Sequence, residues 1–362
     1  MIEHAYIHIP FCIRKCHYCS FVSGFNINKK AKYISALKTE IEKRYKGEKL
    51  STIYFGGGTP SLLEAEELSE ILNYFNFDNF CEITLEANPE TVTKEKLTKI
   101  KNAGFNRISL GVQTFNNNLL KLIGRNHNEE TVYQAIQTIK NAGFKNISID
   151  LIYGLPNQTL DDFIKDLKKA IKLDIQHIST YGLKIEDESF FGENPPSNLP
   201  NDEQQASMFL ELCKILKDNN FEHYEISNFA KKGYESNHNC AYWKNKNYYG
   251  FGLNASGYEE NTRYKNTGYF EEYIKNPLNK EEEEILTEQE TMENEIFLAL
   301  RLNEGINISE INQKYKIDFE QKYKKTIDKY TNLDMLKIKN GYCNLTEKGI
   351  LLSNEIMSEF LD

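Results

Sequence analysis

The sequence of 362 residues has no long apolar run. No stretch approaches the roughly 20 apolar residues that a membrane-spanning helix needs, and the mean hydropathy is −0.59. The first six residues, Met1-Ile-Glu-His-Ala-Tyr6, show neither the basic nor the apolar segment of a signal peptide. We therefore expect a cytoplasmic protein without a membrane span, in which thiols stay reduced.

An excess of positive charge is also missing. Lys and Arg number 44 against 53 Asp and Glu, which gives a net charge of −9. Binding along a phosphate backbone needs a basic surface, so this balance argues against nucleic acid as a partner. The length and a hydrophobic content of 40% suffice for one large domain and a smaller one.

A disulfide framework is absent as well, because the seven cysteines are odd in number and mostly scattered. Three of them, Cys12, Cys16 and Cys19, lie within eight residues, directly after an expected strand. Three thiolates are one ligand short of a tetrahedral zinc site or a four-iron cluster. A structural zinc with His17 as fourth ligand is the alternative, although such sites usually combine two separated ligand pairs. The four single cysteines are expected to be inert: Cys81, Cys213, Cys240 and Cys343. Cys240 is a partial exception because of its neighbours.

In the first half of the chain, short β-rich runs alternate with helical stretches, which is typical of parallel strands joined by crossover helices. We expect strands at residues 5–9, 52–55, 82–86, 107–112, 146–151 and 177–183. We expect helices at residues 31–45, 64–75, 94–103, 130–142 and 160–173. The motif Ile-Lys-Asn-Ala-Gly-Phe occurs at residues 100–105 and again at 139–144, each time before a strand. These six units predict an α/β fold with a partial (β/α)6 TIM-like barrel.

The pattern changes after residue 183. A proline-containing loop, a helix at 202–219 and an aromatic-rich segment at 234–273 follow, and the acidic run at 281–284 is expected to be a solvated linker or a helix start. From residue 287, helices and a small hairpin predict a mostly helical, winged-helix-like domain with a structural or lid role. We therefore divide the chain into residues 1–200, 201–285 and 286–362.

Polar groups follow several expected strands, at the end of a barrel where active sites lie. Phe55-Gly-Gly-Gly-Thr-Pro60 allows close approach of a ligand, and its N–H groups could bind a carboxylate. Glu86, Gln113 and Asp150 lie at later strand ends, and Arg125 follows. Carboxylates suit ribose hydroxyls, and an arginine suits a carboxylate. A tight turn and structural polar groups are the alternatives.

Cys-x-x-x-Cys-x-x-Cys directly after a first strand resembles the radical S-adenosylmethionine (SAM) superfamily. That resemblance implies a [4Fe-4S] cluster held by Cys12, Cys16 and Cys19, with SAM on the fourth iron. The order of motifs is similar to the oxygen-independent coproporphyrinogen III oxidase family over essentially the whole chain. In that family the corresponding positions contact SAM, and they are Tyr6, Gly57, Gly58, Thr59, Glu86, Gln113, Arg125 and Asp150. Whether one or two SAM molecules bind stays open.

Two departures separate this chain from the oxidases of that family. The oxidases carry a further cysteine two residues after the third, where this chain has Phe21, and a longer segment before the first strand. His238-Asn-Cys-Ala-Tyr-Trp243 instead resembles a motif of the family's heme chaperone branch. The resemblance implies His238 as an axial ligand of heme, for which neutral imidazole is well suited. A structural histidine among aromatic residues is the alternative.

The sequence thus favours a chaperone that binds heme and delivers it to apo-hemoproteins such as respiratory enzymes, with an electron donor to the cluster. No catalytic residue is predicted. The alternative is an oxidase that converts coproporphyrinogen III to protoporphyrinogen IX, and a third possibility is a radical SAM enzyme acting on an unrelated substrate. Whether a chaperone of this kind also catalyses a radical reaction stays open.

Overall fold

The computed structural model describes residues 1–361, and its main feature is a curved nine-stranded sheet in the order β7-β8-β6-β5-β4-β3-β2-β1-β9. Its six central strands are parallel and adjacent in chain order. They are β1 (His4–Ile9), β2 (Lys49–Gly57), β3 (Asn76–Ala87), β4 (Arg107–Gln113), β5 (Asn146–Tyr153) and β6 (His177–Gly182). The expected six-unit partial barrel is confirmed.

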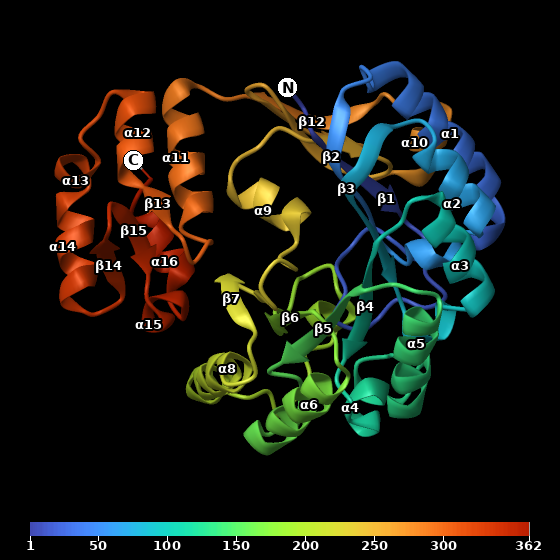
Figure 1. Cartoon of the computed structure of the whole chain (residues 1–362), viewed down its shortest axis with the longest axis horizontal. Helices are drawn as coiled ribbons and strands as arrows, with labels where there is room; N and C mark the ends of the chain where they lie inside the picture. The colour runs from blue at the N-terminus through green and yellow to red at the C-terminus, as the bar shows by residue number, and fades with distance from the viewer. Residues whose placement is uncertain (362) are drawn as a thin grey trace.

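Crossover helices connect these strands and cover the outer face of the sheet (Figure 1). They are α1 (Lys30–Arg44), α2 (Ala65–Leu72), α3 (Lys94–Ala103), α4 (Asn117–Leu122), α5 (Glu129–Asn141) and α6 (Leu160–Lys172). In the repeated motif, Gly104 and Gly143 follow α3 and α5 with φ of 122° and 87°. Glycine adopts this backbone without strain, so each helix ends cleanly before the next strand.

Successive side chains of each strand point to opposite faces of the sheet. On β4, Ile108, Leu110 and Val112 pack into the main hydrophobic core beneath the helices. The alternate positions, Arg107 and Ser109, therefore face the inside of the barrel. The inward positions of the other strands are polar too: His4, Tyr6 and His8 on β1, Thr52 and Tyr54 on β2, Glu82, Thr84 and Glu86 on β3, Ser148 and Asp150 on β5, and His177 and Ser179 on β6. Bulky apolar residues fill a closed TIM barrel, so this polar interior is suited to binding.

Further strands extend the sheet at both edges. β9 (Tyr249–Phe251) pairs with β1 in parallel, whereas β8 (Asn228–Ala230) pairs antiparallel with β6, and β7 (Glu222–Glu225) with β8. Helix α8 (Asp202–Lys217) packs against α6. The short helix α9 (Asn237–Trp243) contacts both β2 and the C-terminal helix α11 (Glu288–Ala299), and it lies between the barrel and the C-terminal helices in Figure 1.

The acidic run was expected to be a linker or a helix start, and that expectation is wrong. It forms β12 (Lys280–Ile285), the edge strand of a three-stranded sheet with β10 (Ser256–Glu259) and β11 (Thr262–Asn266). Glu282 and Glu284 of β12 pair in register with Lys265 and Arg263 of β11. Opposite charges across the ladder compensate the acidic strand, and its exposed edge of carboxylates discourages pairing with other chains.

The C-terminal region has its own hydrophobic core, built from residues between Met292 and Phe360. Its helices are α11, α12 (Ile308–Tyr315), α13 (Phe319–Lys322), α14 (Lys324–Asn332), α15 (Glu347–Ile350) and α16 (Ser353–Ser358). They surround a small sheet of β13 (Ile306–Asn307), β15 (Tyr342–Leu345) and β14 (Leu336–Lys339). Among residues 1–361, none of the helices combines the length and apolar character needed to cross a bilayer.

Candidate functional site

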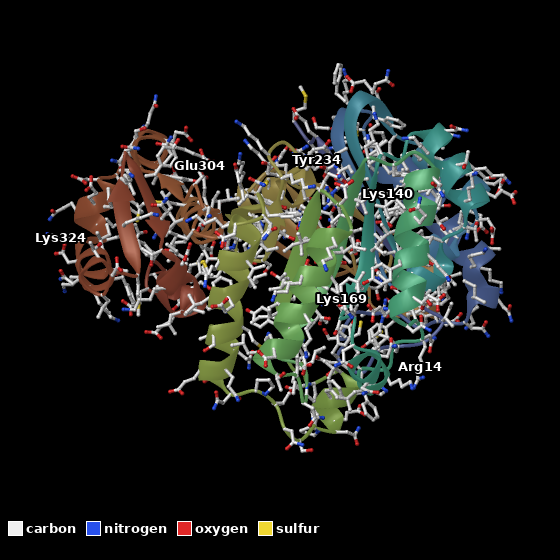
Figure 2. The ribbon with its side chains drawn as sticks, turned by 60° about the horizontal axis from the view of Figure 1, so that its bottom comes forward. Arg14, Lys140, Lys169, Tyr234, Glu304 and Lys324 are labelled. Atoms are coloured by element: carbon white, nitrogen blue, oxygen red, sulfur yellow. The ribbon has the colours of Figure 1, made fainter. Side chains whose placement is uncertain are left out.

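The loop after β1 carries Cys12, Cys16 and Cys19, all partly exposed and unpaired. Two donors reach its sulfurs: Thr59 Oγ1 lies 3.5 Å from Cys12 Sγ, and Arg125 Nη1 lies 3.5 Å from Cys16 Sγ. Hydrogen bonds to sulfur and nearby positive charge stabilise thiolates that ligate a metal centre. Arg14 of this loop and Tyr234, just before α9, lie at opposite ends of the barrel in Figure 2.

His17 anchors this loop. Its Nδ1–H donates to the carbonyl of Leu122 at 2.8 Å, and its ring packs on Phe190 of α7 (Phe190–Glu193) with centroids 4.5 Å apart. A zinc site would need this side chain beside the thiols. Within residues 1–361, no three His, Cys, Asp or Glu side chains are grouped to hold one metal ion. A four-iron cluster takes one thiolate per iron, so its thiolates need not converge on a single point.

The glycine turn after β2 packs closely against the cysteine loop. A Cβ on Gly58 would lie 2.7 Å from the carbonyl oxygen of Phe11 and 2.8 Å from that of Ile9. The N–H of Gly58 donates to Ile9 O at 2.8 Å, and that of Thr59 donates to Phe11 O at 2.7 Å. The expectation that these N–H groups are available to a carboxylate is therefore wrong. In the structure they fasten the turn to the loop.

Glu86, at the end of β3, faces this turn. Its Oε2 accepts from the N–H of Gly57 at 3.1 Å, and its Oε1 accepts from the hydroxyl of Tyr54 at 2.8 Å. Burial raises the pKa of Glu86 to about 7, although both hydrogen bonds favour its ionised form. On β5, Asp150 accepts from the hydroxyl of Ser109 at 3.2 Å, and burial raises its pKa too.

Arg125 crosses the end of β4. Its Nη2 donates to Gly111 O at 2.6 Å and to Asn88 Oδ1 at 2.7 Å, while Nη1 points to the sulfur of Cys16. Its Nε is buried without a partner. Gln113, at the same strand end, has a φ of 69°, an uncommon backbone for a residue other than glycine. Strained backbone of this kind often accompanies binding sites.

Tyr6 faces the interior from β1 and donates to His8 Nδ1 at 3.0 Å. The opposite nitrogen, Nε2, donates to the carbonyl of Val22 at 3.0 Å. Burial lowers the pKa of His8 to about 4, so the ring is neutral and this pattern sets its tautomer. The chain from Tyr6 to Val22 ties the first strand to the far end of the cysteine loop.

His238 lies on α9 and is 2% exposed. Its Nδ1 bonds with Thr52 Oγ1 at 2.7 Å, and its Nε2 bonds with the hydroxyl of Tyr242 at 2.7 Å. Burial lowers its pKa well below the usual value, so the ring is neutral. With both nitrogens hydrogen-bonded, the lone pair of the ring is not free for iron. The heme-ligand role of His238 stays a prediction, and it requires at least one of these bonds to break.

The structure therefore gathers most of the predicted site residues at one end of the barrel and leaves one apart. The structure places this group in the cysteine loop, at inward or carboxyl-terminal positions of β1 to β5, or, for Arg125, in the loop after α4: the three cysteines, Tyr6, the glycine turn, Glu86, Gln113, Arg125 and Asp150. His238 instead bonds to Thr52, four residues before Gly56, towards the start of β2. Trp243 does not join it, because its indole packs against Arg301 of the C-terminal region, 5.1 Å from ring centroid to guanidinium carbon.

Three interior residues escaped the sequence reasoning. Asn88 links Thr59 and Arg125: its Nδ2 donates to Thr59 Oγ1 at 3.1 Å, and its Oδ1 accepts from Arg125. Tyr54 joins Glu86 to the ring of His238. Arg107 is 2% exposed and its Nε has no partner. For Tyr54 and Arg107 the available signal was the period of two, which places these strand residues on the polar face. Asn88 directly follows β3.

The residues present fit the expected cofactors. We call the end of the barrel that carries the cysteine loop its mouth. The groups there are three thiols, an arginine with an unpartnered buried nitrogen and two carboxylates, beside a turn that excludes any side chain larger than glycine. Thiolates hold iron, and carboxylates and a guanidinium complement the ammonium, hydroxyl and carboxylate groups of SAM.

Comparison with known proteins agrees with this site. The family model of the radical SAM superfamily matches residues 6–170, and that of the HemN C-terminal domain matches residues 286–352. The chain is 40% identical to heme chaperone HemW of Lactococcus lactis, over 99% of this chain and 97% of that protein. It is 36% identical to heme chaperone HemW of Bacillus subtilis, over 99% of each.

Among solved structures, coproporphyrinogen III oxidase (HemN) from Escherichia coli superposes with a TM-score of 0.87, over 99% of this chain and 90% of that one, at 24% identity. This likeness confirms the fold and does not separate chaperone from oxidase. The curated relatives do, because full-length proteins named as heme chaperones are 40% and 36% identical to this chain, compared with 24% for the oxidase. The chain therefore belongs to the heme chaperone HemW family of the radical SAM superfamily.

Proposed function

We propose that this protein binds heme and delivers it to apo-hemoproteins, while a SAM-liganded [4Fe-4S] centre occupies the mouth of its barrel. The observation that carries the proposal is the full-length similarity to heme chaperones, at 40% and 36% identity. The proposal places the activity in the cytoplasm, with apo-hemoproteins such as respiratory enzymes and an electron donor to the cluster as partners.

The residues of the mouth would hold the cofactors. Cys12, Cys16 and Cys19 would bind three irons, which leaves the fourth open to SAM. When bound, the cluster supplies an electron and SAM a sulfonium that reduction can cleave. Arg125 would orient the SAM carboxylate, and Glu86 and Asp150 would accept hydrogen bonds from its hydroxyl or ammonium groups. Tyr6, Gly57, Gly58, Thr59 and Gln113 would shape the site around it.

The alternative function, oxidative decarboxylation of coproporphyrinogen III, is favoured by the fold alone. At the position where the oxidases carry a further cysteine, this chain has Phe21, whose side chain is 63% exposed and carries no metal-binding atom.

His238 is the proposed heme ligand, with Tyr242 beside it on α9. Since its two nitrogens bond to Thr52 and Tyr242, heme binding would have to break at least one of these bonds.

One anaerobic preparation, reconstituted with iron and sulfide, tests both functions. Heme is titrated and followed by its Soret band, and protoporphyrinogen is assayed in the presence of SAM and reductant. We expect stoichiometric heme uptake without porphyrinogen turnover. Formation of protoporphyrinogen would refute the chaperone proposal. In His238→Ala the Soret band should shift or vanish, whereas His223→Ala, which removes a half-buried histidine packed on Phe229, should leave it unchanged. An unaltered Soret band in His238→Ala would remove that residue from the ligand set.

A further inference from the structure

Tyr54 lies between the two sites that the proposed function requires. It stands on the inner face of β2, and its hydroxyl donates to Oε1 of Glu86 at 2.8 Å. Its ring stacks on the ring of His238, with centroids 5.0 Å apart and planes inclined by 22°. One side chain thus touches both a residue expected to bind SAM and the residue expected to bind heme.

The side chains of Tyr54, Tyr6 and Glu86 lie close together around Gly56. A Cβ on Gly56 would lie 2.9 Å from the Tyr54 ring, 3.0 Å from the Tyr6 ring and 3.1 Å from Oε1 of Glu86. Tyr54 also stacks on Tyr6, at 6.2 Å between centroids. Glu86 thus contacts Tyr54 through a hydrogen bond and through their shared position around Gly56, so a shift of the carboxylate would be passed to the ring.

His238 receives a second contact from the same strand. Thr52, two residues before Tyr54 and on the same face of β2, bonds to its Nδ1 at 2.7 Å. The strand ends in the glycine turn, where the N–H of Gly57 donates to the other oxygen of Glu86 at 3.1 Å. β2 therefore carries contacts to His238 at one end and to the expected SAM site at the other.

We propose that Tyr54 is a positioning residue through which SAM bound at Glu86 holds His238 inside the barrel and disfavours its ligation to heme. This inference rests on the proposed function and adds a regulatory link to it. A carboxylate has about four acceptor positions, so hydroxyl or ammonium donors of SAM add to the bond from Tyr54 and need not displace it. Such donors favour the ionised carboxylate, which accepts a stronger hydrogen bond from Tyr54 than the protonated form does.

The link has a direction and must be reciprocal. If SAM tightens the contact from Glu86 through Tyr54 to His238, heme has to break a more stable arrangement to reach the imidazole. Heme bound at His238 must then weaken SAM by the same factor, because coupling between two binding sites is symmetric. Couplings of this kind commonly change affinity by about fivefold or more.

The test titrates heme into the cluster-loaded protein with and without saturating SAM. We expect SAM to weaken heme binding at least about fivefold in the wild type. Tyr54→Phe keeps the ring but removes the hydroxyl. In this variant, saturating SAM should change the affinity for heme by less than about twofold. Tyr249→Phe is the matched control. The hydroxyl of Tyr249 also donates a hydrogen bond to a carboxylate, that of Glu48 at 3.0 Å, but Tyr249 lies on β9 rather than on β2. It should retain the wild-type SAM effect.

Amide hydrogen exchange of residues 237–243 provides a second readout that needs no heme. SAM should slow exchange of α9 in the wild type and in Tyr249→Phe, but not in Tyr54→Phe. An equal SAM effect in wild type and Tyr54→Phe, by either readout, would overturn the role of Tyr54. Unchanged α9 exchange in the wild type, or tighter heme binding with SAM, would overturn the coupling itself. Absence of heme binding with and without SAM would instead refute the proposed function, while the exchange experiment would still decide the role of Tyr54.

Discussion

The carboxylate of Glu82 on β3 accepts a hydrogen bond from the backbone N–H of His238, 156 residues further along the chain, at 3.1 Å. Its other oxygen accepts from the N–H of Asn237 at the same distance. The first turn of a helix leaves N–H groups without partners. A strand of the barrel supplies those partners for α9, so the helix that bears the predicted heme ligand is held by a buried charge.

Replacing that charge should loosen α9. In Glu82→Gln one N–H retains an amide oxygen while the other faces an NH2 group, and a hydrogen bond to a charged acceptor is worth about 1.5–3 kcal/mol. We expect the free energy of unfolding, from denaturant titration of the apo-protein, to fall by about 1–3 kcal/mol. Glu222→Gln, an exposed residue of β7, should change it by less than about 0.5 kcal/mol. Equal midpoints for Glu82→Gln and wild type would show that α9 is held by other contacts.

The three loop cysteines should be separable from the buried ones by cluster retention. Alanine at Cys12, Cys16 or Cys19 removes one of three iron ligands, so each variant should lose most of its iron and its visible iron–sulfur absorbance after reconstitution and gel filtration. Cys213→Ala removes a buried thiol on α8 instead. That variant should keep its cluster and show only a modest loss of stability from the small cavity. Full iron retention in all three loop variants would refute the cluster assignment.

Much of this arrangement could be predicted from the sequence. The elements that could not be predicted have a common physical cause: they depend on contacts with distant parts of the chain. The β-rich runs and the repeated motif at residues 100–105 and 139–144 are local signals, and they located the six barrel strands and the ends of α3 and α5. The strand at residues 280–285 was missed, because four successive glutamates are disfavoured in an isolated strand and are stabilised here by cations across the ladder. Helix α9 was missed for the same reason. Seven residues do not form a stable helix alone, and Glu82 is far away in sequence.

The candidate site shows the same division. Positions on or near the strands can be read from the order of elements, which is why Glu86 and Asp150 could be predicted to face the interior of the barrel. The hydrogen-bond partners of a turn cannot be read from the sequence in this way. Gly58 and Thr59, for example, donate their N–H groups to carbonyls more than 45 residues earlier in the chain. Nor does a sequence show that both nitrogens of His238 are already bonded.

Arg125 should matter through its geometry rather than its charge. Its fork reaches Gly111 O, Asn88 Oδ1 and the sulfur of Cys16 together, whereas lysine offers one ammonium that cannot span them. Arg125→Lys should therefore lower SAM affinity, and iron retention with it, by about 10–100-fold. Arg14→Lys, on the exposed part of the cysteine loop, conserves charge in the same way and should match the wild type. Binding of SAM to Arg125→Lys with unchanged affinity would exclude the proposed carboxylate contact.

The raised pKa of Glu86 predicts how SAM binding depends on pH. Its value of about 7 means that the carboxyl is mostly protonated at pH 6 and mostly ionised at pH 8. Ionised Glu86 accepts hydrogen bonds from SAM at both oxygens, whereas the protonated form loses acceptor capacity. SAM affinity, measured by isothermal titration of the cluster-loaded protein, should therefore rise roughly tenfold from pH 6 to pH 8.

The stability of the apo-protein should fall as the pH rises, in the opposite direction to the SAM affinity. Folded Glu86 binds its proton more tightly than unfolded Glu86, so its stabilising contribution is complete at low pH and is lost as pH rises through about 7. Asp150, whose pKa is also raised by burial, contributes with the same sign. Glu86→Gln is the decisive variant for both effects, because glutamine cannot ionise. It should bind SAM more weakly at pH 8 and flatten both pH profiles relative to wild type. A tenfold rise in SAM affinity that persists in Glu86→Gln would assign the titration to another group.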